Sequence, residues 1–236
     1  MRKPFIFKQF SLFDGNSAMK LSTDAVLLGI FSRVSHPEHI LDIGTGSGIL
    51  ALMLAQRSEA IIVGIDIDKG SVEDAKRNFE ESPWKSRISA FHQSLYDFTR
   101  TCGQKFDLIV SNPPFFENSK RSPYHSRNIS RHDEQLCFHD LILAVKSLLK
   151  TRGTCSFIIP ASEEINFQKI ATGNNLYLLR KKLVYPKKAK NENRVLLEYS
   201  QIDSGPVEES FLIIRNEDNS FTQEYIDYTM EFYLNL

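Results

Sequence analysis

The sequence SNPPFF, at residues 111–116, directly follows the short apolar run FDLIV. That run has the length and composition of a buried strand, so Asn112 lies where the strand is expected to end. Pro113 and Pro114 fix the backbone torsion φ and lack N–H donors, which holds the carbonyls of this turn in fixed directions. A proline pair can also end a strand without any chemical role. The segment nevertheless presents an amide, rigid carbonyls and the ring of Phe115 together, which favours a binding site.

A second polar segment, LDIGTGSGIL, contains Asp42 and the glycines Gly44, Gly46 and Gly48. Glycines allow a tight turn and the close approach of a ligand to the backbone, and a helix is expected to begin directly afterwards. A dinucleotide site would have the spacing G-x-G-x-x-G, whereas the spacing here is G-x-G-x-G. An acid just before the loop would repel a pyrophosphate but suits a positively charged amino group. The alternative is a glycine turn that only joins a strand to a helix.

Further candidates for contacts with the same ligand come from the loop and from the ends of the next two strands. Asp66 ends the run IIVGID, where a carboxylate can accept hydrogen bonds from both hydroxyls of a ribose. Thr45 lies inside the glycine loop, and Ile67 follows Asp66. Asp97 is a candidate acceptor for an adenine amino group, with a helix cap or an ordinary loop position as the alternative. A ligand with an adenosine-like sugar, a cation and no phosphate is required, and S-adenosylmethionine meets all three conditions.

The elements that must position these residues alternate along the chain. Strands are expected at 39–43, 60–66, 88–91, 106–110, 155–160, 176–185, 194–200 and 211–214, and helices at 49–56, 69–81 and 132–150. Alternation of this kind predicts a doubly wound α/β fold, with a mostly parallel sheet, helices on both faces and ligands at the carboxyl ends of the strands. The late strands around a basic turn predict an antiparallel hairpin. No repeat or linker divides residues 1–236, so we expect a single domain.

Composition limits the classes of function. The 236 residues are 42% hydrophobic and 25% charged, which suits a globular domain, and no apolar run approaches the roughly 20 residues that span a bilayer. Three widely spaced cysteines without a C-x-x-C pair indicate reduced thiols, so we expect a cytoplasmic protein without membrane contact. The histidines have no partners at metal-ligand spacing, so we expect no metal site.

Net charge is zero, so no overall field attracts nucleic acid. Two local segments are basic: 118–132 has four Lys or Arg residues and no acid, and 180–194 has seven against one acid. Each could be a solvated loop or a contact surface for an anionic partner.

The three motifs, D-I-G-T-G-S-G, G-I-D and N-P-P-F, together resemble those of class I S-adenosylmethionine-dependent methyltransferases. The resemblance implies a Rossmann-like, seven-stranded sheet. N-P-P-F at the end of the fourth strand is similar to the signature of enzymes that methylate an amine conjugated to a π-system. Such amines are adenine N6, guanine N2 and the side-chain amide of glutamine.

The resemblance also implies roles for the residues of the N-P-P-F motif. The lone pair of such an amine is delocalised, so the enzyme must hold the nitrogen in line with the methyl group. By analogy with the family, the side-chain oxygen of Asn112 and the carbonyl of Pro113 accept hydrogen bonds from the two N–H groups. Pro114 keeps the turn rigid, and Phe115 stacks on the ring. Alignment of this kind can lower a barrier by about 7–11 kcal/mol.

Both ends of the chain resemble bacterial methyltransferases that modify N6 of adenine 37 in a valine tRNA. The N-terminal match is M-K-x-x-T-D-[AG]-x-L-L-G, and the C-terminal matches are RVLLEY and the closing FTQEYIDYTMEFYLNL. The resemblance implies tRNA as partner, with 118–132 and 180–194 as candidate contacts, and we expect a monomer. Residues 1–35 are expected to cover the cofactor and substrate cleft. Lys20 and Thr23 would contact the cofactor or the RNA, or serve a structural role.

Three other functions stay open at this point. A glutamine N5-methyltransferase acting on protein would have the same motif, although about 35 residues leave little room for the N-terminal helical domain usual in those enzymes. A guanine-N2 methyltransferase of ribosomal RNA is the second. The third is a catalytically inactive methyltransferase fold that binds a partner.

Overall fold

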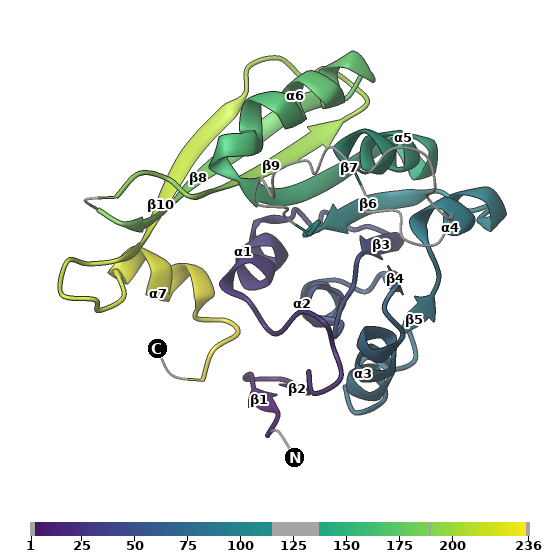
Figure 1. The fold of residues 1–236 in the computed structure, drawn as a ribbon, viewed down its shortest axis with the longest axis horizontal. Coiled ribbons are helices and arrows are strands. Elements are labelled where there is room, and N and C mark those ends of the chain that lie inside the picture. The colour runs from purple at the N-terminus through teal and green to yellow at the C-terminus, as the bar shows by residue number, and fades with distance from the viewer. Residues whose placement is uncertain (1–2, 115–136, 189, 235–236) are drawn as a thin grey trace, which may run out of the picture.

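In the computed structural model, the described residues are 3–114, 137–188 and 190–234. Their centre is an eight-stranded sheet with the strand order β10-β8-β9-β7-β6-β3-β4-β5 (Figure 1). The strands are β3 (His39–Ile43), β4 (Ile61–Asp66), β5 (Ile88–His92), β6 (Phe106–Ser111), β7 (Leu149–Pro160), β8 (Tyr177–Lys187), β9 (Arg194–Ser200) and β10 (Glu208–Arg215).

The strand directions confirm the predicted mostly parallel sheet with a late antiparallel hairpin. Strand β9 runs antiparallel to both of its neighbours, β7 and β8, and every other neighbouring pair in this sheet is parallel. The sheet has one strand more than the seven expected. The additional strand is β10, which pairs with β8 at the edge and extends the run expected at 211–214.

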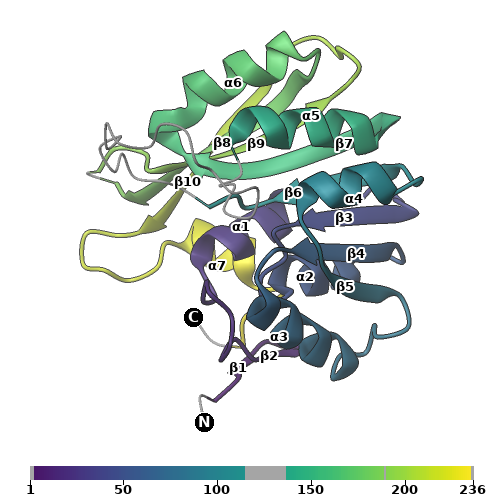
Figure 2. The same ribbon diagram turned by 45° about the vertical axis from the view of Figure 1, so that its right-hand side comes forward.

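Helices cover both faces of the sheet, as Figures 1 and 2 show. One face packs against α1 (Thr23–Phe31), α2 (Ile49–Arg57), α3 (Lys69–Glu80) and α7 (Gln223–Thr229). The other face packs against α4 (Leu95–Thr101), α5 (Phe138–Leu148) and α6 (Glu164–Gly173), with a 3-10 turn at Ala161–Glu163 before α6. The central strand β3 contributes Ile40 to the first core and Leu41 to the second, which is why it is apolar throughout.

The two ends of the chain lie together on the face of α1, α2 and α3 (Figure 2). A short hairpin, β1 (Phe5–Ile6) with β2 (Ser11–Leu12), precedes α1. Phe7 forms an isolated bridge with Tyr233, and the N–H of Lys8 donates to the carbonyl of Phe232 at 2.8 Å. The N-terminal segment is therefore part of the same folded body as the C-terminus.

One expected boundary is wrong. The helix expected at 132–150 ends at Leu148, and Leu149 already begins strand β7, while residues 132–136 lie outside the described part. Gly153 lies inside the strand. A Cβ there would be 2.9 Å from the carbonyl oxygens of Phe106 and Asp107, at an irregularity in the pairing of β6 with β7.

Candidate active site

The carboxyl ends of β3, β4 and β6 bring the three motifs side by side (Figure 1). In the parallel register, Ile43 lies beside the penultimate residue of β4 and the last residue of β6. Gly44 is therefore flanked by Asp66 on one side and Asn112 on the other. From β3 the chain proceeds outward to β4 and β5, and then returns to β6 on the opposite side of β3. This reversal of strand order is where doubly wound sheets bind ligands.

The glycine loop borders open space. Gly44, Gly46 and Gly48 have φ values of +73°, +56° and +87°, in the left-handed region that other residues enter at a cost. A Cβ added to Gly44 or Gly46 would meet no atom of the described residues within 4 Å. A Cβ on Gly48 would be 2.4 Å from the ring of Phe79. The first two glycines thus leave room for a ligand, and the third allows α2 to pack closely on α3.

Asp42 lies buried beneath this loop with only half of its carboxylate satisfied. Its Oδ2 accepts a hydrogen bond from the hydroxyl of Thr45 at 2.7 Å, whereas Oδ1 accepts none of normal geometry from the described residues. Burial raises the pKa of Asp42 to about 7, against the lowering effect of the Thr45 hydrogen bond. A ligand cation above the loop would supply the missing partner. The hydroxyl of Thr45 is directed at Asp42, and contact of Thr45 with the cofactor stays a prediction.

Asp66 connects the end of β4 to the loop. Its Oδ2 accepts the N–H of Gly46 and its Oδ1 accepts the N–H of Asp68, both at 2.8 Å. Each carboxylate oxygen retains capacity for a further hydrogen bond, as contact with a ribose requires. Burial raises the pKa of Asp66. The next residue, Ile67, has 60% of its surface exposed, which makes an apolar surface available beside the expected sugar.

Asn112 carries the feature expected of the amine site. Its Oδ1 is covered from solvent and has no hydrogen-bond donor among the described residues. A buried acceptor without a donor is costly, so this oxygen is a candidate to accept a hydrogen bond from a ligand, and that contact stays a prediction. The preceding Ser111 is fixed by its hydroxyl, which donates to the carbonyl of Ile43 at 2.9 Å. Pro113 is buried and Pro114 exposed, and Phe115 lies outside the described residues.

Asp97 takes part in a helix cap. It lies in the first turn of α4, where its N–H donates to the hydroxyl of Ser94 at 3.1 Å and its Oδ2 accepts from the same hydroxyl at 2.7 Å. This is the capping alternative that the sequence left open. Contact with an adenine amino group stays a prediction for this residue.

Lys20 and Thr23 lie in different surroundings. The ammonium of Lys20 donates to the carbonyls of Asp14, Gly15 and Ser17 at 2.6, 3.2 and 2.9 Å, which closes the turn between them. These contacts support the structural alternative for Lys20. Thr23 is the first residue of α1 and is exposed. Contact of either residue with the cofactor or the RNA stays a prediction.

Asp74 of α3, which the sequence did not single out, holds the N-terminal segment in place. The carboxylate is buried and its Oδ2 accepts the backbone N–H groups of Asn16 and Ser17, each at 2.8 Å. The hydroxyl of Ser17 and the amide of Asn16 add hydrogen bonds at 2.8 and 2.9 Å.

Asn78, one helical turn later, connects the same segment to the glycine loop. Its amide donates to the carbonyls of Phe13 and Ser47 at 2.7 and 2.8 Å, and its oxygen accepts the N–H of Phe13 at 2.8 Å. The N-terminal segment therefore borders the loop. Asp74 and Asn78 are four residues apart on α3, so the sequence places them on the same side of the helix. The charged composition of that helix nevertheless suggested that both are exposed.

The structure separates the basic residues of 180–194 into two groups. Four face neighbouring elements: Arg180 pairs with Glu198 at 2.9 Å, Lys181 with Glu164 at 3.2 Å and Arg194 with Asp24 at 2.7 Å, while burial lowers the pKa of Lys182. The other three are Lys187, Lys188 and Lys190, at and beyond the carboxyl end of β8, and they are partly or fully exposed. The other basic segment, 118–132, lies outside the described residues.

The family follows from comparison with known proteins. The sequence model of the methyltransferase small domain family matches residues 21–159. The chain belongs to this family. This methyltransferase is also similar over its full length to two proteins named tRNA1(Val) (adenine(37)-N6)-methyltransferase. That of Bacteroides fragilis is 38% identical, with 100% of each chain covered, and that of Flavobacterium johnsoniae is 40% identical, with 98% of this chain and 100% of the relative covered.

Solved structures support the fold of this methyltransferase. A predicted O-methyltransferase from Agrobacterium tumefaciens superposes with a TM-score of 0.66 at 19% identity, covering 89% of this chain and 96% of the other. The ribosomal protein L11 methylase of Lactobacillus delbrueckii subsp. bulgaricus gives a TM-score of 0.56 at 22% identity, covering 79% and 82%. The Rossmann-like class I methyltransferase fold expected from the sequence is confirmed.

The methyl donor of this methyltransferase is S-adenosylmethionine, and the site fits it. No atom of the described residues fills the space next to Gly44 and Gly46, which leaves room for the cofactor. The same residues leave Oδ1 of Asp42 without a donor, which fits the cofactor's amino group, and the carboxylate of Asp66 fits its ribose. Within the described ranges, no group of three or more His, Cys, Asp or Glu side chains could hold a metal ion. No helix in the described part is long and apolar enough to cross a membrane.

Proposed function

We propose that this methyltransferase methylates N6 of adenine 37 in the anticodon loop of a valine tRNA, in the cytoplasm where tRNA is found. The observation that carries the proposal is the position of Asn112: it follows Ser111, the register partner of Ile43 just before the glycine loop, and its covered Oδ1 has no donor among the residues that the structure describes. The names of the relatives, at 38% and 40% identity over essentially the whole chain, support adenine 37 as the target.

The cofactor is held by the ends of β3 and β4. In this proposal the Asp42 carboxylate binds the cofactor's amino group, and the backbone of Gly44 and Gly46 lies against the cofactor. Asp66 binds the ribose, with Ile67 beside it. S-adenosylmethionine supplies a methyl group on a positively charged sulfur, which is already activated for transfer.

The adenine amine is positioned by the end of β6. Asn112 Oδ1 and the carbonyl of Pro113 each accept one N–H, which holds the nitrogen lone pair toward the methyl group. As the N–C bond forms and the S–C bond breaks, the nitrogen gains positive charge, so both acceptors bind more strongly in the transition state than in the ground state. One N–H proton is then lost to water, which restores a neutral amine.

A base in an anticodon loop suits this site. Such a base is already unpaired, so its Watson–Crick edge can reach the two acceptors without the free energy of unpairing that a base in a duplex would require. Three described cations of 180–194 remain available for phosphates: Lys187 at the carboxyl end of β8, and Lys188 and Lys190 just beyond it. The N-terminal segment borders the glycine loop through Asn78, in keeping with a role at the edge of the cleft. A single copy of the chain supplies all of these residues, and we propose a monomer as the active form.

The test is direct. The purified protein is incubated with total RNA and S-adenosylmethionine labelled in its methyl group, and the RNA is digested to nucleosides. We expect labelled N6-methyladenosine in the tRNA fraction. Label in N2-methylguanosine of ribosomal RNA, or in protein, would replace the proposal by one of the two alternative amines. Absence of both label and cofactor binding in calorimetry would indicate an inactive fold.

A further inference from the structure

A hollow of about 540 Å³ lies at the carboxyl ends of β8 and β10, apart from the glycine loop. Three parts of the chain that are distant in sequence form its walls: the N-terminal hairpin with the start of α1, the ends of the two strands, and the C-terminal helix region. Its lining residues are Phe5, Leu21, Ser22, Thr23, Pro186, Lys187, Ile214, Arg215, Phe221, Tyr225 and Tyr233. Two are cations, four are aromatic and none is acidic, although the whole chain has equal numbers of acidic and basic residues.

The two cations stand directly opposite each other. Lys187 and Arg215 are register partners in the parallel pair of β8 and β10. Neighbouring strands lie about 4.8 Å apart, and like charges facing each other across strands destabilise a sheet. The carboxylate of Asp218 attracts Lys187 electrostatically, but Asp218 is exposed, so solvent screens this attraction. A bound anion would relieve the repulsion, and a phosphate has oxygens for both side chains.

Arg215 is also held in place. Its guanidinium lies 4.1 Å from the centroid of the Phe221 ring, and Phe221 stacks on Tyr225 with a centroid distance of 4.9 Å and an interplanar angle of 20°. The Phe221 ring is thus itself fixed by Tyr225, and its contact with Arg215 pre-positions that side chain at the wall of the hollow. An ordered guanidinium loses little entropy when it binds a phosphate.

Phe5 provides an aromatic surface at the mouth of the hollow. The residue is 43% exposed although its ring contacts Tyr233 edge-on, with a centroid distance of 5.9 Å and an angle of 78°. An exposed ring next to paired cations is the combination that proteins use to bind single-stranded nucleic acid, where bases stack on aromatic rings.

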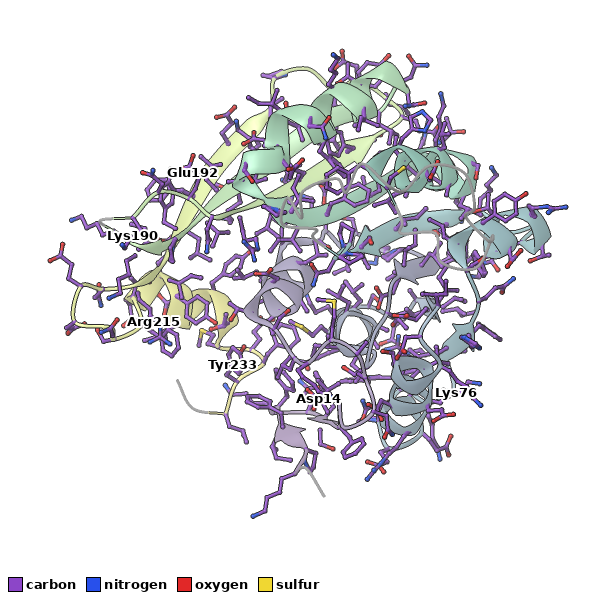
Figure 3. All side chains as sticks on the ribbon, in the orientation of Figure 1. Asp14, Lys76, Lys190, Glu192, Arg215 and Tyr233 are labelled. Atoms are coloured by element: carbon purple, nitrogen blue, oxygen red, sulfur yellow. The ribbon has the colours of Figure 1, made fainter. Side chains whose placement is uncertain are left out.

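The hollow lies on the same edge of the sheet as Asn112. In the strand order, β8 is separated from β6 by β9 and β7, which is about 14 Å across the sheet. The registers place Ser111 level with Lys181, so Lys187 lies six residues, about 20 Å, further along, and the two strand ends are about 25 Å apart. A few nucleotides of unpaired strand span such a distance. Figure 3 shows Arg215, Lys190 and Tyr233 on the side of the molecule opposite Lys76.

We propose that this hollow binds an unpaired nucleotide of the RNA substrate other than the target adenine, with its phosphate between Lys187 and Arg215 and its base on Phe5. This proposal rests on the function proposed above and adds a second point of attachment for the loop. Two attached points fix the direction of the strand through the site and thereby select which base reaches Asn112.

The charge contribution is tested with the double variant Lys187→Gln/Arg215→Gln, and Lys76→Gln on α3 is the control for loss of an exposed cation. Binding of an anticodon stem-loop RNA from valine tRNA is measured at several salt concentrations. Each lost phosphate contact should weaken binding about fourfold at 0.15 M salt and reduce the log–log salt slope by about 0.7. Cofactor affinity should stay the same. A double variant that binds RNA like Lys76→Gln would overturn the proposal.

The stacking contribution is tested with Phe5→Leu, which keeps apolar packing but removes the ring face. The variant is combined with stem-loops that carry an abasic site at one loop position at a time, position 37 excepted. At one loop position, the loss of binding caused by the abasic site should not add to the loss caused by Phe5→Leu, because both changes remove the same stacking contact. Additive losses at every position would contradict stacking on Phe5. Failure of the wild-type protein to methylate tRNA would instead refute the proposed function itself, so the two failures are distinguishable.

Discussion

Replacing Asp42 by asparagine should remove a pH dependence from cofactor binding. In the free protein the buried carboxyl has a pKa of about 7, and the described residues donate a hydrogen bond to only one of its oxygens. If the amino group of S-adenosylmethionine binds Asp42, the complex contains the ionised form, and binding in mildly acidic solution must first remove a proton. Affinity should therefore rise with pH until the carboxyl is ionised in the free protein as well.

The size of this effect follows from the pKa. With a value of about 7, about a tenth of the Asp42 carboxyl is ionised at pH 6 and about three quarters at pH 7.5. The dissociation constant of the wild-type protein should fall about eightfold between these pH values, relative to that of Asp42→Asn. The amino group of the ligand titrates alike in both proteins, so the comparison isolates Asp42.

The same ionisation should be visible in stability. Because the folded-state pKa lies above the ordinary value of 3.8, this group favours folding most at low pH, and its contribution is lost as the pH rises toward 7. Between pH 5.5 and 7.5 the free protein should lose about 2 kcal/mol of unfolding free energy relative to Asp42→Asn. Urea unfolding at the two pH values measures the difference, and calorimetry measures the affinities. Equal pH dependence in the two proteins would refute the assignment of Asp42 to the amino group.

Two further predictions concern the cofactor and the core. Asp66→Ala should weaken cofactor binding by about ten- to a hundredfold in calorimetry, because hydrogen bonds to a charged acceptor contribute about 1.5–3 kcal/mol; an unchanged dissociation constant would exclude the ribose contact. Arg180→Ala should lower the unfolding free energy by about 3–5 kcal/mol because it leaves the fully buried Glu198 without its ion partner, whereas Arg33→Ala, at an exposed pair, should cost less than about 1 kcal/mol. Similar losses in urea unfolding for the two arginine variants would contradict the buried role of Arg180.

The parts of the fold that could be predicted are those where burial leaves a local signal. Strands β3, β4 and β6 are largely buried, so their apolar runs were read with boundaries correct to within one residue. The boundary between α5 and β7 was missed because Leu148 and Leu149 are both apolar and belong to different elements. Periodicity does not show where a helix ends if the next strand begins with an apolar residue.

The residues of the candidate site also differ in whether their positions could be predicted from the sequence. Asp42, Asp66 and Asn112 follow strands directly, and adjacent strand ends must meet at the edge of a parallel sheet, so their proximity could be predicted. The contacts of Lys20 and Asp74 could not, because each depends on a turn or a distant segment. Polar residues in such contacts have the same composition as solvated ones.

The basic segment 180–194 shows what charge counting misses. Arg180 and Arg194 have acidic partners, Glu198 and Asp24, that only the folded sheet brings near them. The count of seven basic residues was correct, but it overstated the number available for RNA.

The most direct test of the central claim is the rate of methyl transfer by Asn112→Ala under single-turnover conditions, with saturating S-adenosylmethionine and valine tRNA. Loss of one positioned hydrogen-bonding group at a reacting centre typically lowers the rate on the order of 10²–10³-fold, and we expect a loss of that size. Cofactor affinity should stay within a few-fold of the wild-type value, because the proposed function assigns Asn112 to the amine rather than to the cofactor. A variant that retains most of its transfer rate would show that this amide does not hold the target nitrogen.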